Sequence, residues 1–212
     1  MLTRLLSIPA VYELFQRAVG AHSSRSTYVR DHVRPQEGEL VLDIGCGPGD
    51  ILPHLPAGVQ YHGLDHSAAY ISAAKQRYGE RGLFEVKDVA DLVAEQPSSY
   101  DVIMANGVLH HLDDETVGHV LRTARLLLKP GGRWVSFDGC YTPGQSRVAK
   151  MLLDRDRGRH IRTEPQYLAL IRRSFPTAKA VLRHDLLRIP YTHIILEATC
   201  EMLSHPAGGG MS

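Results

Sequence analysis

Residues 41–50, VLDIGCGPGD, join a short apolar run to a loop with three glycines at alternate positions. The apolar run has the length and composition of a buried strand. Because Gly45, Gly47 and Gly49 lack a Cβ atom, they permit a tight turn and a close approach of a ligand to the main chain. The stretch predicts a nucleotide-binding loop after a strand, and its alternative is an ordinary strand-to-helix turn.

The spacing of these glycines argues against two common nucleotide-binding loops. The dinucleotide fingerprint is G-x-G-x-x-G, whereas this loop is G-x-G-x-G, with Asp50 in the place of the last glycine of that pattern. A carboxylate there would repel a pyrophosphate that approached the helix N-terminus. A P-loop is also excluded, because no Gly-Lys-Ser/Thr follows. A nicotinamide-dependent oxidoreductase is therefore disfavoured.

Strands and helices are predicted to alternate along the chain. The predicted strands are 41–44, 61–65, 83–86, 100–105 and 133–137, and the predicted helices between them are 51–55, 68–78 and 114–128. A helical pattern from 5 to 33, broken around 20–26, comes before them, and segments 180–187 and 192–200 form a hairpin after a further helical region. Such alternation favours a parallel sheet covered on both faces, with ligands beyond the carboxyl ends of the strands.

Composition and charge narrow the class of protein. The chain has 212 residues, of which 43% are hydrophobic and 22% charged, so we expect one globular domain without a transmembrane segment. A formal net charge of +1 gives no reason to expect a nucleic-acid partner. Three widely spaced cysteines without a CxxC pair fit a reducing compartment, and the first twenty residues lack the pattern of a signal peptide, so we expect a cytoplasmic protein.

Five motifs in order resemble one known family. They are residues 41–50, GLDHS at 63–67, KDVADL at 87–92, YDVIMANGVLHHL at 100–112 and LLKPGGRWVSFDG at 127–139. Together they resemble the class I S-adenosylmethionine-dependent methyltransferases, in particular the small-molecule branch called type 11. The resemblance implies an α/β fold: a Rossmann-like, seven-stranded, mostly parallel sheet with helices on both faces, the last strand antiparallel and a helical cap at the N-terminus. It also implies S-adenosylmethionine as cofactor and S-adenosylhomocysteine as product.

The expected domain organisation follows from these motifs. We expect a single methyltransferase domain over residues 1–204, followed by a flexible tail at 205–212. Its parts are a helical cap at 1–37, a cofactor-binding core at 38–140, an acceptor-side insert at 141–178 and a C-terminal hairpin at 179–204. The protein is expected to be a monomer or a homodimer.

Two strand ends carry the residues predicted to bind the adenosine half of the cofactor. Asp65 ends the second strand, where a carboxylate can accept hydrogen bonds from both ribose hydroxyls. His66 follows it in the same motif. After the third strand, Asp88 could accept from the adenine amino group while the main-chain amide of Val89 donates to the ring. The alternatives are a solvated strand-end carboxylate for Asp65 and a turn residue for Asp88.

The glycine loop and the fourth strand are predicted to hold the methionine half. Asp43 has the position of a buried carboxylate, which needs partners. The resemblance implies that the loop amides or the cofactor's ammonium group supply them, and a purely structural Asp43 is the alternative. Gly45, Cys46 and Gly47 belong to this loop, where Cys46 is a packing residue rather than a nucleophile. The resemblance also implies that Asn106 lines this end.

His110, His111 and Asp138 are the candidate catalytic residues. The resemblance puts His110 and His111 near the cofactor's methyl group, and the pKa of histidine suits a general base near neutral pH. We expect His110 to be the base and His111 to position the acceptor or contact the cofactor, with a structural His110 as the alternative. Asp138 follows the fifth strand and either orients the acceptor or merely ends the strand. A methylsulfonium is already activated, so in-line alignment supplies much of the acceleration.

The loop after the fourth strand also bears on metals and acceptors. No HxxxH or HExxH pattern occurs, and the loop begins with Asn106-Gly-Val-Leu instead of the carboxylates of the metal-dependent relatives, so no metal is expected. The Asn/Asp-Pro-Pro-aromatic motif of enzymes that methylate nucleobase amino groups is absent as well. We therefore expect a small-molecule acceptor that is methylated on oxygen or nitrogen.

Segment 147–173 carries eight lysines and arginines against three acidic residues. Such a segment is a solvated helix face, or it binds an anionic acceptor or an acidic membrane surface. A non-catalytic module that binds the cofactor is the alternative to an enzyme.

Overall fold

The structure, a computed structural model, describes residues 20–156 and 158–201. Residues 1–19 of the predicted helical cap and the whole predicted tail at 205–212 lie outside this description. The described part of the cap is helical, and α3 (Ala21–Tyr28) continues directly into a π-helical turn, Val29–Val33.

The sequence predicts a break in the helical pattern around residues 20–26. This prediction is wrong except at Gly20, because residues 21–26 are helical. Gly20 has a left-handed backbone with φ of 82°, and α3 begins immediately after it. The helix forms despite its serines because Ala21, Ser24 and Tyr28 lie on one buried face against the sheet.

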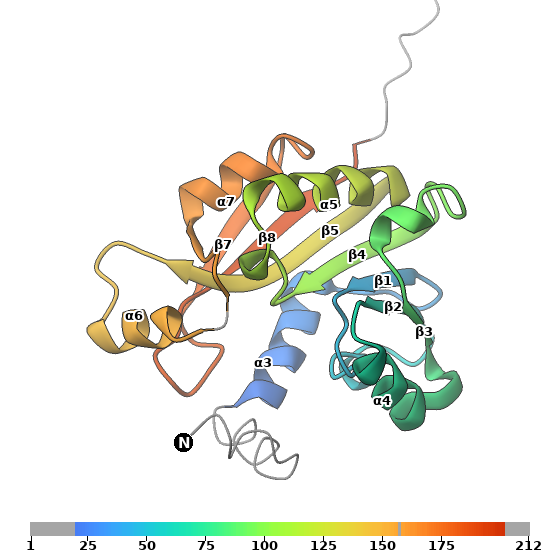
Figure 1. Cartoon of the computed structure of the whole chain (residues 1–212), viewed down its shortest axis with the longest axis horizontal. Coiled ribbons are helices and arrows are strands. Elements are labelled where there is room, and N and C mark those ends of the chain that lie inside the picture. Colours follow the sequence, from blue (N-terminus) through green and yellow to red (C-terminus); the bar gives the residue numbers. More distant parts are fainter. Residues whose placement is uncertain (1–19, 157, 202–212) are drawn as a thin grey trace, which may run out of the picture.

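Eight strands form the sheet within the described residues, in the order β3-β2-β1-β4-β5-β8-β7, with the short β6 paired to β5 (Figure 1). Their bounds are β1 Leu40–Ile44, β2 Gln60–Asp65, β3 Leu83–Val86, β4 Tyr100–Asn106, β5 Leu128–Tyr141, β6 Arg162–Thr163, β7 Lys179–Arg183 and β8 His193–Thr199. β8 runs antiparallel to both β5 and β7, and the other pairs are parallel. The mostly parallel sheet with an antiparallel last strand is confirmed.

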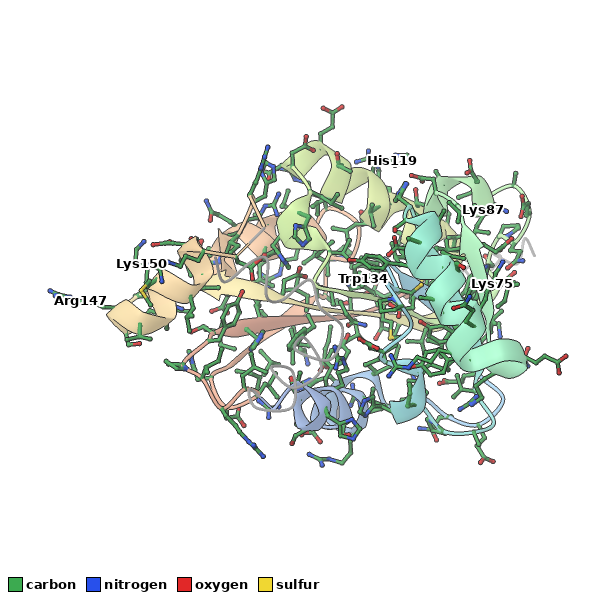
Figure 2. The ribbon with its side chains drawn as sticks, turned by 60° about the horizontal axis from the view of Figure 1, so that its bottom comes forward. Lys75, Lys87, His119, Trp134, Arg147 and Lys150 are labelled. Atoms are coloured by element: carbon green, nitrogen blue, oxygen red, sulfur yellow. The ribbon has the colours of Figure 1, made fainter. Side chains whose placement is uncertain are left out.

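Helices cover both faces of this sheet, as predicted. The buried residues of α5 (Asp114–Leu127) and α7 (Glu164–Ile171) pack on one face, where Figure 1 shows the two helices beside each other. Those of α3 and α4 (Ala68–Tyr78) pack on the other. Neighbouring strand residues point to opposite faces, so that Ile103 and Trp134 contribute to the first cluster and Val102 contributes to the second. Figure 2 shows Trp134 in the interior.

β5 is longer than the predicted strand 133–137. It begins at Leu128, directly after α5, and passes through Gly131, whose φ of 81° suits only glycine well. At its other end it runs on to Tyr141, because Cys140 and Tyr141 pair with β6. This extension carries Asp138 and leads into α6 (Arg147–Asp154), which lies apart from the other helices (Figure 1). Among the described residues, no helix has the length and apolar character that a membrane crossing requires.

Candidate active site

The glycine loop presents bare main chain beyond the end of β1. Gly45, Gly47 and Gly49 all have left-handed backbones, with φ of 69°, 55° and 76°. A Cβ atom on Gly45 would lie 2.6 Å from Val108 Cγ2, so only glycine fits there. A Cβ atom on Gly47 would meet nothing within 4 Å. The loop therefore packs tightly on the β4 side and faces open space at its centre.

A cavity of about 280 Å³ opens over this loop. Its walls are α3, the glycine loop, the end of β4 and Phe137 of β5. Of the predicted site residues, those that line it come from the first and fourth strands and the loop, namely Asp43, Gly45, Cys46, Gly47 and Asn106. The remaining predicted residues lie outside its lining.

Two side chains in this cavity have buried polar atoms without a hydrogen-bond partner among the described residues. Asp43 accepts a hydrogen bond of 2.7 Å from the Tyr61 hydroxyl at Oδ2, but its Oδ1 has no partner. Neither the amide oxygen nor the amide nitrogen of Asn106 has one. Buried polar atoms are normally paired, so this pattern indicates a polar ligand. Burial raises the pKa of Asp43 to about 7, although the Tyr61 bond opposes the shift.

Cys46 is a packing residue, as the sequence indicated. Its Sγ lies 2.8 Å from the point where a Cβ atom on Gly63 would stand, so the thiol fills the space that this glycine leaves. Burial raises the pKa of the thiol well above its ordinary value, which removes the thiolate that a nucleophile needs.

Asp65 lies beside the loop and fixes its shape. Its Oδ2 accepts from the Gly47 amide at 2.9 Å and its Oδ1 from the Ser67 amide at 2.8 Å. Each carboxylate oxygen has a second lone pair, so Asp65 can still accept from a ligand hydroxyl.

His66, which follows β2, and Asp88, which follows β3 and is the predicted adenine-edge carboxylate, lie close together. His66 is largely exposed, and its Nε2 is 3.6 Å from Asp88 Oδ2. Asp88 also caps a 3-10 turn, Val89–Leu92, by accepting from the Ala90 amide at 2.8 Å. Asp88 therefore has the role of a turn residue through Oδ1, while its Oδ2 lies on the side of His66.

Arg25 and Phe137 are cavity residues that sequence reasoning missed. Arg25 comes from α3, and its Nη2 lies 3.5 Å from Asp50 Oδ2, while Arg77 donates to the other oxygen at 2.8 Å. Two guanidinium groups thus surround the carboxylate of Asp50. The predicted helix break over this part of the chain concealed Arg25, and Phe137 follows an ordinary strand pattern.

His110 is buried between two carboxylates. It lies in a 3-10 turn, Leu109–His111, with Nδ1 2.8 Å from Asp138 Oδ1 and Nε2 3.4 Å from Asp156 Oδ1. Burial lowers the pKa of His110, but hydrogen bonds and charge attraction from Asp138 and Asp156 outweigh it and raise the pKa to about 9. In this arrangement the ring is an imidazolium at neutral pH, whereas a general base must be neutral.

His111 and Arg162 complete the surroundings of this turn. His111 is exposed, and its ring centroid lies 4.2 Å from that of His110. Arg162 is buried, and its guanidinium donates to the carbonyl oxygens of Leu109 at 2.9 Å and Leu112 at 2.7 Å. Arg162, the one arginine that is buried among the described residues of the basic segment, therefore fixes the loop after β4.

The other described basic residues of segment 147–173 lie outside the cavity lining. Lys150 pairs with Asp154 at 3.0 Å, and Arg147, Arg155 and Arg159 are exposed. Figure 2 shows Arg147 and Lys150 on α6, pointing away from the sheet. For residues 20–156 and 158–201, no group of three or more His, Cys, Asp or Glu side chains could hold a metal ion.

The mostly parallel sheet thus carries a glycine loop after β1, an acidic residue at the end of β2 and a cavity at the ends of β1 and β4. Residues 42–134 match the family model described as a methyltransferase domain. This part of the chain, less than half of its length, is thus similar to a methyltransferase domain, and the fold is similar to that of solved S-adenosylmethionine-dependent methyltransferases.

Individual relatives are similar to parts of the chain or to its fold. A ubiquinone biosynthesis O-methyltransferase of Xanthomonas euvesicatoria is 35% identical over 100 residues, which make up 45% of this chain and 41% of that protein. The chain thus matches less than half the length of this curated relative. The 1,6-didemethyltoxoflavin-N1-methyltransferase of Burkholderia thailandensis has a TM-score of 0.66 at 22% identity, covering 94% of this chain and 87% of that one. Geranyl diphosphate C-methyltransferase from Streptomyces coelicolor has a TM-score of 0.65 at 18% identity, over 84% and 75%.

Proposed function

We propose that this protein transfers the methyl group of S-adenosylmethionine to an oxygen or nitrogen atom of a small molecule. The observation that carries the proposal is Asp43 Oδ1, which belongs to a residue of the cavity lining and has no hydrogen-bond partner among the described residues. A buried carboxylate oxygen there calls for a cationic or donor group from a ligand. The α-ammonium group of the cofactor is such a group, and the cofactor supplies the activated methyl when bound.

Other residues fit the remaining parts of this cofactor. Arg25 provides a positive charge at the cavity for the cofactor's carboxylate, and the main chain of Gly47 lies open beside it. Asp65 retains lone pairs for the ribose hydroxyls. Asp88 and Val89 are the candidates for the adenine edge, with His66 near Asp88.

The acceptor would lie on the β4 and β5 side of the cavity. Tyr28, Asn106 and Phe137 line this side, and Gly107 lies directly before the loop that carries His110. Tyr28 and Phe137 have ring centroids 5.3 Å apart and form an apolar wall. The described lysines and arginines of the basic segment do not line this cavity, so the proposal does not extend to an anionic acceptor.

His110 is the candidate general base, and Asp138 orients its ring. The acceptor requires a base only if its reacting atom carries a proton at the working pH, as in an alcohol, a phenol or an ammonium group. His111 is exposed on the same turn, and we assign it a part in positioning the acceptor.

Two measurements test this function in order. Calorimetry should detect binding of S-adenosylhomocysteine and no binding of NAD, and the reverse result would overturn the proposal. A coupled assay of S-adenosylhomocysteine release against a metabolite library, with mass determination of the product, should then identify the acceptor. Binding of S-adenosylhomocysteine without turnover on any acceptor in the panel would instead favour a non-catalytic cofactor-binding module.

A further inference from the structure

We propose that the Asp156 carboxylate is the partner of His110 Nε2 in the free enzyme and that the acceptor's hydroxyl or ammonium group displaces it from this nitrogen when the acceptor binds. The inference rests on the proposed function, in which His110 is the base. It adds Asp156, from the segment after α6, as a positioning residue.

The two carboxylates on His110 are not equivalent, and Asp138 is the permanent partner. Asp138 Oδ1 lies 2.8 Å from Nδ1 and also accepts from the main-chain amide of His110 at 3.2 Å. Its side chain is 1% exposed. A buried carboxylate on Nδ1 fixes the tautomer of the ring and leaves Nε2 as the nitrogen that exchanges a proton with a substrate.

Asp156 is the weaker and more accessible partner. Its Oδ1 is 3.4 Å from Nε2, and its side chain is 27% exposed. It has two other partners, since Gly158 donates its amide to Oδ1 at 2.9 Å and Tyr191 donates its hydroxyl to Oδ2 at 2.8 Å. Asp156 can therefore leave Nε2 and remain hydrogen-bonded, which makes its displacement less costly than that of Asp138.

The ring of His110 lies close to the cavity in which the acceptor is proposed to bind. Gly107 lines the cavity, and a Cβ atom on it would lie 3.6 Å from His110 Cε1, the carbon between the two ring nitrogens. The Cε1 edge of the imidazole therefore approaches Gly107, a residue of the cavity lining that has no side chain. On its other side the ring contacts Gly158, where any Cβ atom would collide with Cδ2.

Titratable groups face the ring from several elements. Asp138 faces it from β5, Asp156 from the segment after α6 and His111 from the same turn, and His193 of β8 adds a weak interaction. With both carboxylates in place the ring holds its proton. When Asp156 moves away, one of the two anions that stabilise the imidazolium is lost, and the pKa of His110 falls toward the range of a base.

The chemical step then balances without another reactant. The acceptor's oxygen or nitrogen forms a bond to the methyl carbon as the carbon–sulfur bond breaks, and that electron pair stays on sulfur as a neutral thioether. As Asp156 moves away, the imidazolium releases its Nε2 proton to solvent, and the acceptor's proton then passes to Nε2 of the neutral His110. Asp156 can return to the resulting imidazolium after the product leaves.

The test is Asp156→Asn, which keeps the shape of the side chain and removes its charge. The matched control is Asp154→Asn, an exposed residue of α6 that pairs with Lys150 and Tyr141. NMR titration of the His110 ring should show a midpoint at least about one pH unit lower in Asp156→Asn, and no change in the control. The acidic limb of the pH profile of kcat/KM should move to lower pH by the same amount, so that kcat/KM at pH 7 rises by up to about ten-fold.

Each other outcome is decisive as well. An unchanged His110 midpoint, or lower turnover without a shift of the acidic limb, means that Asp156 is only structural and overturns the inference while the proposed function stands. If wild-type protein methylates no acceptor in the panel, the proposed function fails and this inference fails with it. Should Asp156→Asn not fold, as judged by thermal unfolding, Asp156→Ser removes the same charge and is titrated instead.

Discussion

The ionisation of Asp43 should control how tightly the cofactor binds. In the structure this carboxyl is 2% exposed, Oδ1 has no partner among the described residues, and burial raises its pKa to about 7. An ammonium group at Oδ1 favours the charged carboxylate. Binding of S-adenosylhomocysteine should therefore take place with the ionised form and release a proton wherever Asp43 is protonated beforehand.

The size of the effect follows from that pKa. With a pKa of about 7, roughly a tenth of Asp43 is ionised at pH 6 and roughly nine tenths at pH 8. If only the ionised form binds, the association constant rises about ten-fold over this range, which corresponds to about 1.4 kcal/mol. Above pH 8 the affinity should level off, because Asp43 is then fully charged.

Titration calorimetry in two buffers of different ionisation enthalpy measures this directly. Nearly one proton should be released for each S-adenosylhomocysteine bound at pH 6, and about a tenth of one at pH 8. Asp43→Asn keeps an oxygen that can accept from Tyr61, and it should bind more weakly at pH 8 and lose the pH dependence. The reasoning is refuted if Asp43→Asn binds with the wild-type pH dependence, or if no proton is released at pH 6.

Three further outcomes are expected. Asp65→Ala should weaken S-adenosylhomocysteine binding by about ten-fold or more in calorimetry, because the ribose and the Gly47 amide both lose an acceptor; an unchanged affinity would remove Asp65 from the site. His110→Ala should lower turnover in the coupled assay and leave cofactor affinity nearly unchanged, and unchanged turnover would exclude it as the base. The pKa of His110 in the folded protein, about 9, lies above its ordinary value of 6.5. The protonated ring therefore contributes fully to the free energy of unfolding below pH 6.5, and this contribution is lost as the pH rises through 9. Urea unfolding between pH 6.5 and 10 should show a loss of up to about 3 kcal/mol that His110→Gln abolishes.

The glycine loop and the acidic end of β2 were accessible to sequence reasoning because their signals are local. The glycines of residues 45–49 and the acidic end of β2 stand within or directly after apolar runs, and strand pairing alone brings them together. α4 has the predicted bounds, and α5 ends within one residue of its prediction. Such patterns are set by residues a few positions apart, where periodicity is informative.

The surroundings of His110 were less accessible because their contacts come from distant segments. The residue type of His110 suggested a base, but its protonation depends on Asp138 from β5 and on Asp156 from the segment after α6. Nothing near Asp156 in the sequence marks it as a partner of that histidine. Arg162 likewise belonged to a basic run, and only the fold shows that its guanidinium binds carbonyl oxygens of the loop after β4.

The position of β8 has a consequence for how the chain is made. β8 is the last strand of the described sequence, yet it lies between β5 and β7 in the sheet (Figure 1). While the ribosome is still adding residues before 193, the hydrogen-bonding edge of β5 next to Trp134 and Phe137 has no strand to pair with. An unpaired apolar edge is a template for association with other chains. This edge of β5 is therefore covered only after residues 193–199 have been made and β8 pairs with it.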